Sequence, residues 1–224
     1  MPEKAIVFDV DGTLIDSVDL HTRAWQAAFA EYGEQLQFAD LRSQIGKGED
    51  VLMPCFLTQE QVDHFGKKVS KRQGEIFKRR YFSQVRPFAS VPQLFSQLQR
   101  AGWTVVLASS GKRNEIDHHK KLLQIEKLTD LEVSADEVQR SKPHPDIFEL
   151  VLKKLNDLPP SRVLAFGDTP YDIEAAAKIN ILTIGLLSGG FPEKVLVAAG
   201  AAAVFHSPAE LLFRYQEWSP LVSC

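Results

Sequence analysis

The sequence predicts an α/β protein: a Rossmann-like, doubly wound parallel sheet with a helical domain inserted after the first strand. After about residue 87, short apolar and β-branched runs alternate with stretches of helical periodicity. The apolar runs are nearly uninterrupted, which is expected of strands covered by helices on both faces. Between the first and second runs lies a long segment that carries only helical patterns.

Six apolar runs are the expected strands, and each ends in a polar or acidic cluster. They cover residues 4–9, 103–109, 131–134, 162–167, 181–185 and 203–205. The helices expected between and after them cover residues 91–101, 112–124, 146–155, 171–178 and 208–215.

The segment after the first strand predicts a small helical cap domain. Its first helix carries Trp25, Ala28, Phe29 and Tyr32 at helical spacing. A second apolar stripe consists of Val62, Phe65, Val69, Ile76, Phe77 and Tyr81. The expected organisation is a core of residues 1–16 and 87–224, with the cap formed by residues 17–86.

Composition excludes several classes of protein. The 224 residues are 44% hydrophobic and 25% charged, which is ordinary for a folded soluble protein and excludes global disorder. A net charge of −3 gives no reason to expect a nucleic-acid partner. Cys55 and Cys224 have no metal-site or disulfide-scaffold spacing. Acids interrupt the N-terminal segment and no run approaches about 18 apolar residues, so we expect a cytoplasmic protein without a membrane partner.

The strongest chemical pattern lies at the end of the first predicted strand. Asp9 and Asp11 are two residues apart, so both side chains leave the strand on the same side, and Gly12 permits a sharp turn after them. Ligands of open α/β sheets bind beyond the carboxyl ends of the strands. A bare Asp-x-Asp-Gly also matches an ordinary turn that closes a strand.

The longer segment VFDVDGTLIDS resembles the first motif of the haloacid dehalogenase-like phosphohydrolases, in the subgroup with a helical cap after that motif. Later motifs of the family follow in order over essentially the whole chain. Ser109 ends the second strand, Lys142 lies in SKPHPD, and GDTPYD supplies Asp168 and Asp172. Each of these three later motifs is a weak signal alone, but their occurrence together and in this order makes the resemblance specific.

The resemblance implies a phosphoryl-transfer site. Asp9 would attack phosphorus to form an aspartyl-phosphate, which water then hydrolyses. Asp11 would act as general acid and then as general base, with a pKa raised by the neighbouring acids. Ser109 and Lys142 would hold the phosphoryl oxygens, with Ser110 as a neighbouring candidate for the serine.

The resemblance also implies a Mg²⁺ site. Asp168 and Asp172 are four residues apart at a predicted helix start, a spacing that alone matches helix capping, with Asp168 near the N-cap. Together with Asp9 and Asp11 they form a crowded set of carboxylates that needs a cation, and oxygen ligands beside a phosphate suit Mg²⁺. The implied ligands are the Asp9 side chain, the Asp11 backbone carbonyl and Asp168, with Asp172 behind them.

The cap should choose the substrate. His21 shares a helix face with Trp25 and either approaches the site or lies on the helix surface. Lys47, in IGKGED, is part of a segment that resembles the substrate-specificity loop of capped members, although a solvated loop lysine matches it as well. Gln73 is expected to face the cleft. A solvated surface is expected for His118, His119, Glu60, Lys67, Lys68, Lys71, Arg72, Arg79 and Arg80.

The expected activity is Mg²⁺-dependent hydrolysis of a small phosphorylated metabolite. The alternative is a phosphosugar mutase, because His21 to Trp25 (HTRAW) resembles β-phosphoglucomutase. A mutase needs a firm cationic site for a second phosphate, whereas the loop offers Lys47 followed by Glu49 and Asp50. A catalytically silent binding protein is the third possibility, which the complete motif set disfavours, and the acid at Asp11 disfavours a phosphonate hydrolase. The metabolite and the oligomeric state stay open.

Overall fold

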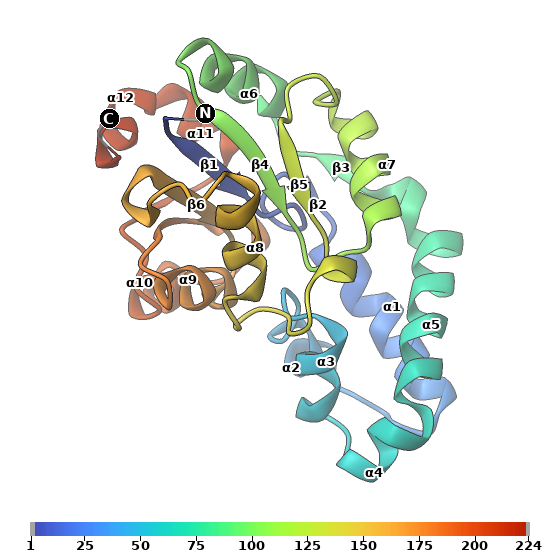
Figure 1. The fold of residues 1–224 in the computed structure, drawn as a ribbon. Coiled ribbons are helices and arrows are strands. Elements are labelled where there is room, and N and C mark those ends of the chain that lie inside the picture. Colours follow the sequence, from blue (N-terminus) through green and yellow to red (C-terminus); the bar gives the residue numbers. More distant parts are fainter. Residues whose placement is uncertain (1–2, 223–224) are drawn as a thin grey trace.

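The computed structural model describes residues 3–222, and a six-stranded parallel sheet forms its centre (Figure 1). The strands lie in the order β5 (Leu131–Val133), β4 (Thr104–Ala108), β1 (Ala5–Phe8), β6 (Val163–Gly167), β7 (Leu182–Leu186) and β8 (Ala203–Phe205). In the register, Phe8 lies opposite Leu107 on one side and Phe166 on the other. The predicted doubly wound parallel sheet is confirmed, with each strand where the sequence placed it.

Helices cover both faces of the sheet because alternate strand residues are buried on opposite sides. Ile6 and Phe8 join one apolar cluster, while Ala5 and Val7 join another. The first cluster includes residues of α6 (Val91–Arg100), α7 (Arg113–Leu123), α11 (Pro208–Phe213) and α12 (Tyr215–Trp218). A further helix, α10 (Glu193–Ala198), follows β7. The second includes residues of α8 (Asp146–Lys154) and α9 (Pro170–Ala177).

A short two-stranded link leads into and out of the helical insertion, the segment of residues 17–85. Strands β2 (Ile15–Asp16) and β3 (Arg86–Pro87) pair antiparallel. Between them lie α1 (Val18–Glu31), α2 (Phe38–Arg42), α3 (Glu49–Leu52), α4 (Gln59–Gln61) and α5 (Lys67–Ile76). The helical content agrees with the sequence, and a division into two domains at these residues stays a prediction.

The long α1 and α5 pack side by side at the outer edge of the insertion (Figure 1). Trp25, Ala28 and Phe29 of α1 and Val69 and Ile76 of α5 are buried in the same cluster, as their spacing predicted. π-helical turns at Val62–Gly66 and Phe77–Tyr81 extend α5 at both ends.

Two findings bear on the predictions made from composition. Among residues 3–222, no helix has the length and apolar character needed to cross a bilayer. Cys55 is an exposed free thiol, and Cys224 lies outside the described residues.

Candidate active site

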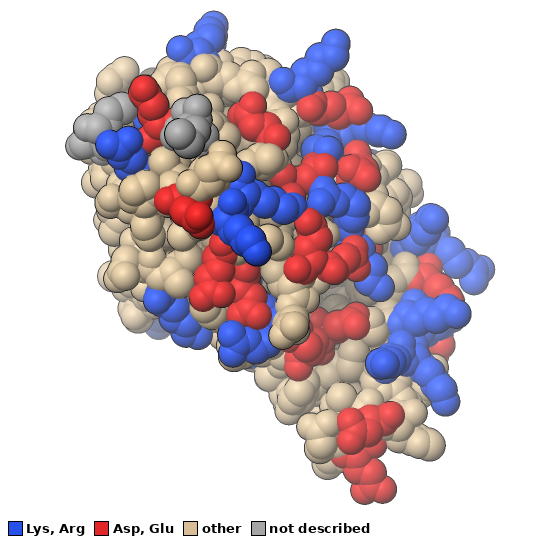
Figure 2. All heavy atoms as spheres, in the orientation of Figure 1, with Lys and Arg blue, Asp and Glu red and all other residues tan. Residues whose placement is uncertain are grey.

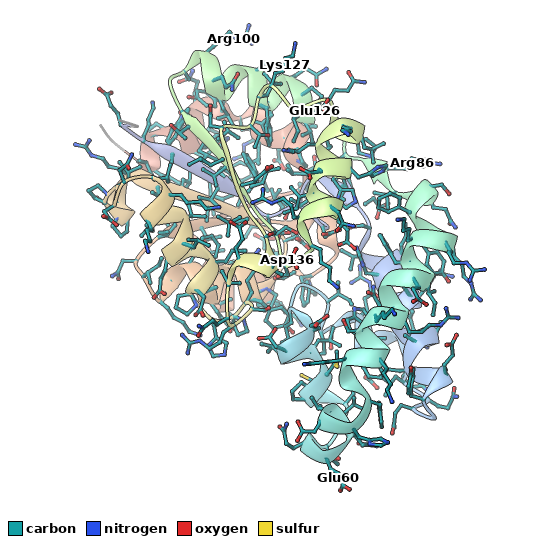
Figure 3. The ribbon with its side chains drawn as sticks, turned by 45° about the vertical axis from the view of Figure 1, so that its right-hand side comes forward. Glu60, Arg86, Arg100, Glu126, Lys127 and Asp136 are labelled. Atoms are coloured by element: carbon teal, nitrogen blue, oxygen red, sulfur yellow. The ribbon has the colours of Figure 1, made fainter. Side chains whose placement is uncertain are left out.

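A cavity of about 780 Å³ lies between the carboxyl ends of the strands and the insertion. Asp9 and Asp11 line it from the core, while Trp25, Gln73 and Phe77 line it from the insertion. Asp136, which also lines it, lies where the core meets the insertion (Figure 3).

Hydrogen bonds hold the insertion against the core on one side of this cavity. The Tyr171 hydroxyl donates to the Ser43 carbonyl at 2.6 Å, and the Ser110 hydroxyl donates to the Gly46 carbonyl at 3.1 Å. The cavity is therefore a cleft with a core floor and a helical wall.

The turn after β1 places Asp9 and Asp11 at the cavity floor. The Asp9 backbone N–H donates to the Phe166 carbonyl at 2.9 Å, which extends the sheet pairing to the aspartate. Gly12 has φ +81°, and a Cβ there would lie 2.3 Å from Asp168 Oδ2. The glycine is required both by its backbone conformation and by its contact with Asp168.

Lys142 links the carboxylates beneath the cavity. Its ammonium donates to Asp9 Oδ1 at 2.7 Å and to the Ala108 carbonyl at 2.9 Å, and it pairs with Asp172 Oδ1 at 2.7 Å. Burial lowers the pKa of Lys142, but the charges of Asp172 and Asp9 outweigh it and raise the pKa above its usual range. Burial, opposed by Lys142, raises the pKa of Asp9 to about 7.

Asp172 and Asp168 have different surroundings at the start of α9. Asp172 Oδ2 accepts from the Thr169 N–H at 3.1 Å and hydroxyl at 2.7 Å, while Thr169 Oγ1 accepts from the Asp172 N–H. This reciprocal pair is a capping box, so Thr169 caps the helix and Asp168 does not. Asp168 Oδ1 instead accepts from the Thr13 hydroxyl at 2.8 Å.

The donor set fits a metal ion. Asp9, Asp168 and Asp172 each offer an oxygen within 4.8 Å of the others. Asp168 Oδ2 is buried without a hydrogen-bond partner among the described residues. Burial and the charges of Asp9 and Asp172 raise the pKa of Asp168 well above its usual range. A cation would satisfy the bare oxygen and relieve the repulsion.

The two serines that follow β4 make different contacts. Ser109 is 1% exposed, and its hydroxyl oxygen accepts from the Gly111 N–H at 2.9 Å, which leaves the hydroxyl proton available to a ligand. Ser110 instead donates its hydroxyl proton to the Gly46 carbonyl. The geometry therefore favours Ser109 over Ser110 as a phosphate contact.

Two side chains of the insertion contact Asp11, and the prediction that its pKa is raised is wrong. The Ser17 hydroxyl donates to Asp11 Oδ1 at 2.6 Å, and His21 Nε2 lies 3.2 Å from the same oxygen. Burial raises the pKa of Asp11, but the charge and hydrogen bond of His21 outweigh it and lower the pKa below its usual range. Burial lowers the pKa of His21, but Asp11 raises it above its usual value.

Comparison with known proteins identifies the family. The model of the haloacid dehalogenase-like hydrolases matches residues 3–180. The chain belongs to this family. The "Phosphorylated carbohydrates phosphatase" of Thermotoga maritima is 30% identical over 216 residues, which cover 93% of this chain and 96% of that protein.

Solved structures show the same architecture. A hydrolase from Pseudomonas syringae superposes with a TM-score of 0.88 at 28% identity, covering 97% of this chain and 99% of that one. A β-phosphoglucomutase-like protein from Bacteroides vulgatus gives 0.86 at 20% identity, covering 99% and 90%. At that lower identity the likeness shows the fold alone.

The insertion of this hydrolase brings His21 and Gln73 to the cavity. The His21 ring stacks on Phe77 at 3.8 Å between centroids, and Gln73 Nε2 lies 3.4 Å from His21 Nδ1. Lys47 also lines the cavity, but its ammonium is bonded to Gln44 and lies 4.7 Å from the centre of the Tyr171 ring.

The expectation that His118 and His119 are exposed is wrong. His118 is half-buried against Phe82, with ring centroids 4.0 Å apart, and it lines the cavity. His119 is 2% exposed, and its Nε2 has no hydrogen-bond partner among the described residues. Both belong to the amphipathic α7, whose buried face includes the position of His119.

Sequence reasoning missed several residues of the cavity wall. Lys71, Gly74 and Lys78 line it from the run that includes α5, and Lys112 and Glu115 line it from the core. The apolar stripe of residues 62–81 identified the buried face of that helical run. It did not show which of the residues beside that face line the cleft. The i, i+3, i+7 spacing of Lys71, Gly74 and Lys78 was the available pattern.

Proposed function

We propose that this hydrolase is a Mg²⁺-dependent phosphatase that removes phosphate from a small phosphorylated metabolite through an aspartyl-phosphate on Asp9. The observation that carries the proposal is the meeting of Asp9, Lys142 and Asp168 at one end of the sheet, from positions far apart in the chain. Kinship with phosphatases and hydrolases over most of the chain supports the reaction class. A cytoplasmic location is part of the proposal and rests on composition.

Asp9 is oriented for nucleophilic attack. Lys142 binds Oδ1, so Oδ2 is the oxygen that attacks phosphorus. A new bond from Asp9 to phosphorus forms as the bond to the leaving oxygen breaks. Water then attacks the aspartyl-phosphate, the bond to Asp9 breaks, and inorganic phosphate leaves.

Asp11 handles the proton in both steps. Asp11 and His21 form a hydrogen-bonded pair, and in this proposal a proton of the pair passes through Asp11 to the leaving oxygen. In the second step Asp11 takes a proton from the attacking water. Ser17 and His21 fix the carboxylate against the cavity floor.

The remaining residues stabilise charge. Ser109 and Lys142 would contact the phosphoryl oxygens, where a hydroxyl proton and a buried ammonium oppose the developing negative charge. Asp9 and Asp168 would hold Mg²⁺, with the Asp11 backbone carbonyl as a third ligand by resemblance and Asp172 orienting Lys142. The bound ion would neutralise charge on the phosphoryl group.

The test is to trap the phosphoryl group on the protein. Incubation with a phosphate ester and Mg²⁺, followed by acid quenching, should yield a phosphoryl adduct that peptide mass spectrometry places on Asp9. Asp9→Asn should lose the adduct and turnover, while Asp16→Asn, an exposed acid in the same segment, should keep both. Excess chelator should stop turnover until Mg²⁺ is restored. Wild-type turnover by Asp9→Asn would reject the nucleophile.

A second test concerns Asp11. Asp11→Asn should slow hydrolysis of alkyl phosphates far more than that of aryl phosphates, because an aryl oxide leaves without protonation. Equal losses on both classes would show that Asp11 does not supply the proton.

The phosphosugar mutase is the second candidate. The specificity loop supplies Lys47, and Lys71, Lys78 and Lys112 line the cavity from other elements, so lysines are present that a second phosphate could contact beside the acids of the same cavity. Incubation with β-glucose 1-phosphate, Mg²⁺ and a trace of the 1,6-bisphosphate separates the two. Glucose 6-phosphate forming faster than free phosphate would favour the mutase. A silent binding protein would produce neither.

A further inference from the structure

Gly74 occupies the interior of α5, where glycine is among the poorest helix formers. A Cβ built on Gly74 would meet no described heavy atom within 4 Å outside the backbone of its own helix. Packing therefore does not require the glycine. Gly74 lines the active-site cavity, so the missing side chain adds space to the cavity wall.

Lys71 and Lys78 flank this space. They lie three residues before and four residues after Gly74, which places all three on one side of the helical run. Both lysines line the cavity. At 1.5 Å rise per residue their Cα atoms are about 10 Å apart along the helix axis, which leaves room for one anionic group between their side chains.

Within the described part of the chain, no ion pair neutralises the two cavity lysines, although acids also line the cavity. Among residues 3–222, neither Lys71 nor Lys78 forms an ion pair, and Glu75, the acid between them, pairs with Arg72 at 3.2 Å. Other acids that line the cavity accept hydrogen bonds from neutral hydroxyl and backbone N–H groups and, among the described residues, form no ion pair with either lysine. These contacts are Glu49 with Ser70, Asp50 with the Ser141 N–H, Asp136 with the Arg113 N–H, and Glu115 with the Lys112 N–H.

The cationic surface continues outside the cavity. Figure 2 shows Lys and Arg side chains gathered over α5 on the outer edge of the insertion. Lys67 and Lys68 are exposed at the beginning of the same helix, and neither lines the cavity. Lys67 and Lys68 therefore carry the same charge as Lys71 and Lys78 but lie outside the cavity.

We propose that Lys71, Gly74 and Lys78 form a seat for a second anionic group, and that preferred substrates are phosphate esters whose leaving group carries a carboxylate or a second phosphate. The esterified phosphate lies at Asp9, and the second group lies between the two lysines in the space at Gly74. This inference rests on the proposed phosphatase function and names the substrate class of that site.

The first experiment compares substrates that differ at one end. Sorbitol 6-phosphate and 6-phosphogluconate have the same carbon chain, ending in an alcohol or in a carboxylate; fructose 6-phosphate and fructose 1,6-bisphosphate test a second phosphate. In at least one pair, the wild type should have a higher kcat/KM for the substrate with the additional anionic group. The pair that shows this difference identifies the anion as a carboxylate or a phosphate. No preference in either pair would overturn the seat. Turnover of p-nitrophenyl phosphate, which has no second anion, tests the phosphatase function separately.

The second experiment removes the charges. The double variant Lys71→Gln, Lys78→Gln should reduce the kcat/KM ratio of the preferred pair about tenfold, because an ion-paired hydrogen bond contributes roughly that factor. The matched control Lys67→Gln, Lys68→Gln removes the same charge from the same helix and should leave the ratio at its wild-type value. Equal changes in the two double variants would show general attraction of anions and would reject the seat.

The third experiment fills the space. Leucine is a good helix former, so Gly74→Leu should melt no lower than the wild type while its side chain occupies the seat. The ratio of kcat/KM for the preferred anionic substrate over glycerol 3-phosphate, a shorter ester, should fall at least tenfold. An unchanged ratio in a folded Gly74→Leu protein would show that the space takes no part in binding.

Discussion

Replacing Lys142 with methionine should destabilise the metal-free protein strongly. The ammonium is 1% exposed and lies 2.7 Å from both Asp9 Oδ1 and Asp172 Oδ1. At an effective dielectric constant of about 20, each contact contributes about 6 kcal/mol of attraction, which the burial of the ammonium partly offsets. Lys142→Met removes this attraction and leaves three carboxylates with an oxygen each within 4.8 Å.

The expected loss is about 3–5 kcal/mol in the free energy of unfolding, the usual cost of breaking a buried ion pair. For a chain of this size it lowers the melting temperature by roughly 6–20 °C. Denaturant unfolding in chelator measures it. Added Mg²⁺ should recover part of the loss, because a cation offsets the repulsion that the lysine offset.

Lys154→Met is the matched control. Lys154 is 30% exposed and pairs with Glu137 on the surface, so its loss should cost less than about 1 kcal/mol. Similar losses in both variants, or a Lys142→Met protein as stable as the wild type without metal, would refute the reasoning.

Two further predictions concern stability. Gly12→Ala should lower the free energy of unfolding by at least about 2 kcal/mol and reduce turnover roughly a hundredfold. The reason is that φ +81° is strained for alanine and that its Cβ would clash with Asp168. Thermal melts and activity assays on one preparation test both effects. His119→Leu should raise the free energy of unfolding by about 1 kcal/mol at pH 7.5, because it removes a buried Nε2 without a partner. Burial lowers the pKa of His119 from 6.5, so the wild type loses stability as the pH falls below 6.5 and the variant should lose less. Urea unfolding at two pH values tests this, and parallel losses would contradict it.

The core half of the site could be predicted because its geometry follows from the sheet. The carboxyl ends of parallel strands meet at one edge, so Asp9, Ser109 and Asp168 had to be neighbours once their strands were placed. Lys142 follows a longer loop, and only its motif indicated that it reaches Asp9 from 133 residues away. Strand patterns alone would have left it out.

The properties set by the insertion could not be predicted in the same way. The pKa of Asp11 was expected to rise because acids surround it, yet His21 lowers this pKa. His21 lies on α1, and the orientation of α1 and its distance from Asp11 depend on tertiary packing. His119 was expected at the surface because the sequence shows no metal-ligand partner for it, yet it lies on the buried face of α7. Periodicity shows that a helix has a buried face, but its partners depend on packing.

Gly74 shows what this difference means for function. In the sequence, a glycine within a helical stretch only lowers the helix propensity. In the structure, the same absence of a side chain becomes space beside Lys71 and Lys78 in the wall of the cavity. That wall belongs to the insertion, whereas Asp9, Lys142 and Asp168 belong to the core. A substitution at position 74 can therefore change which leaving groups fit without moving the atoms that act on phosphorus.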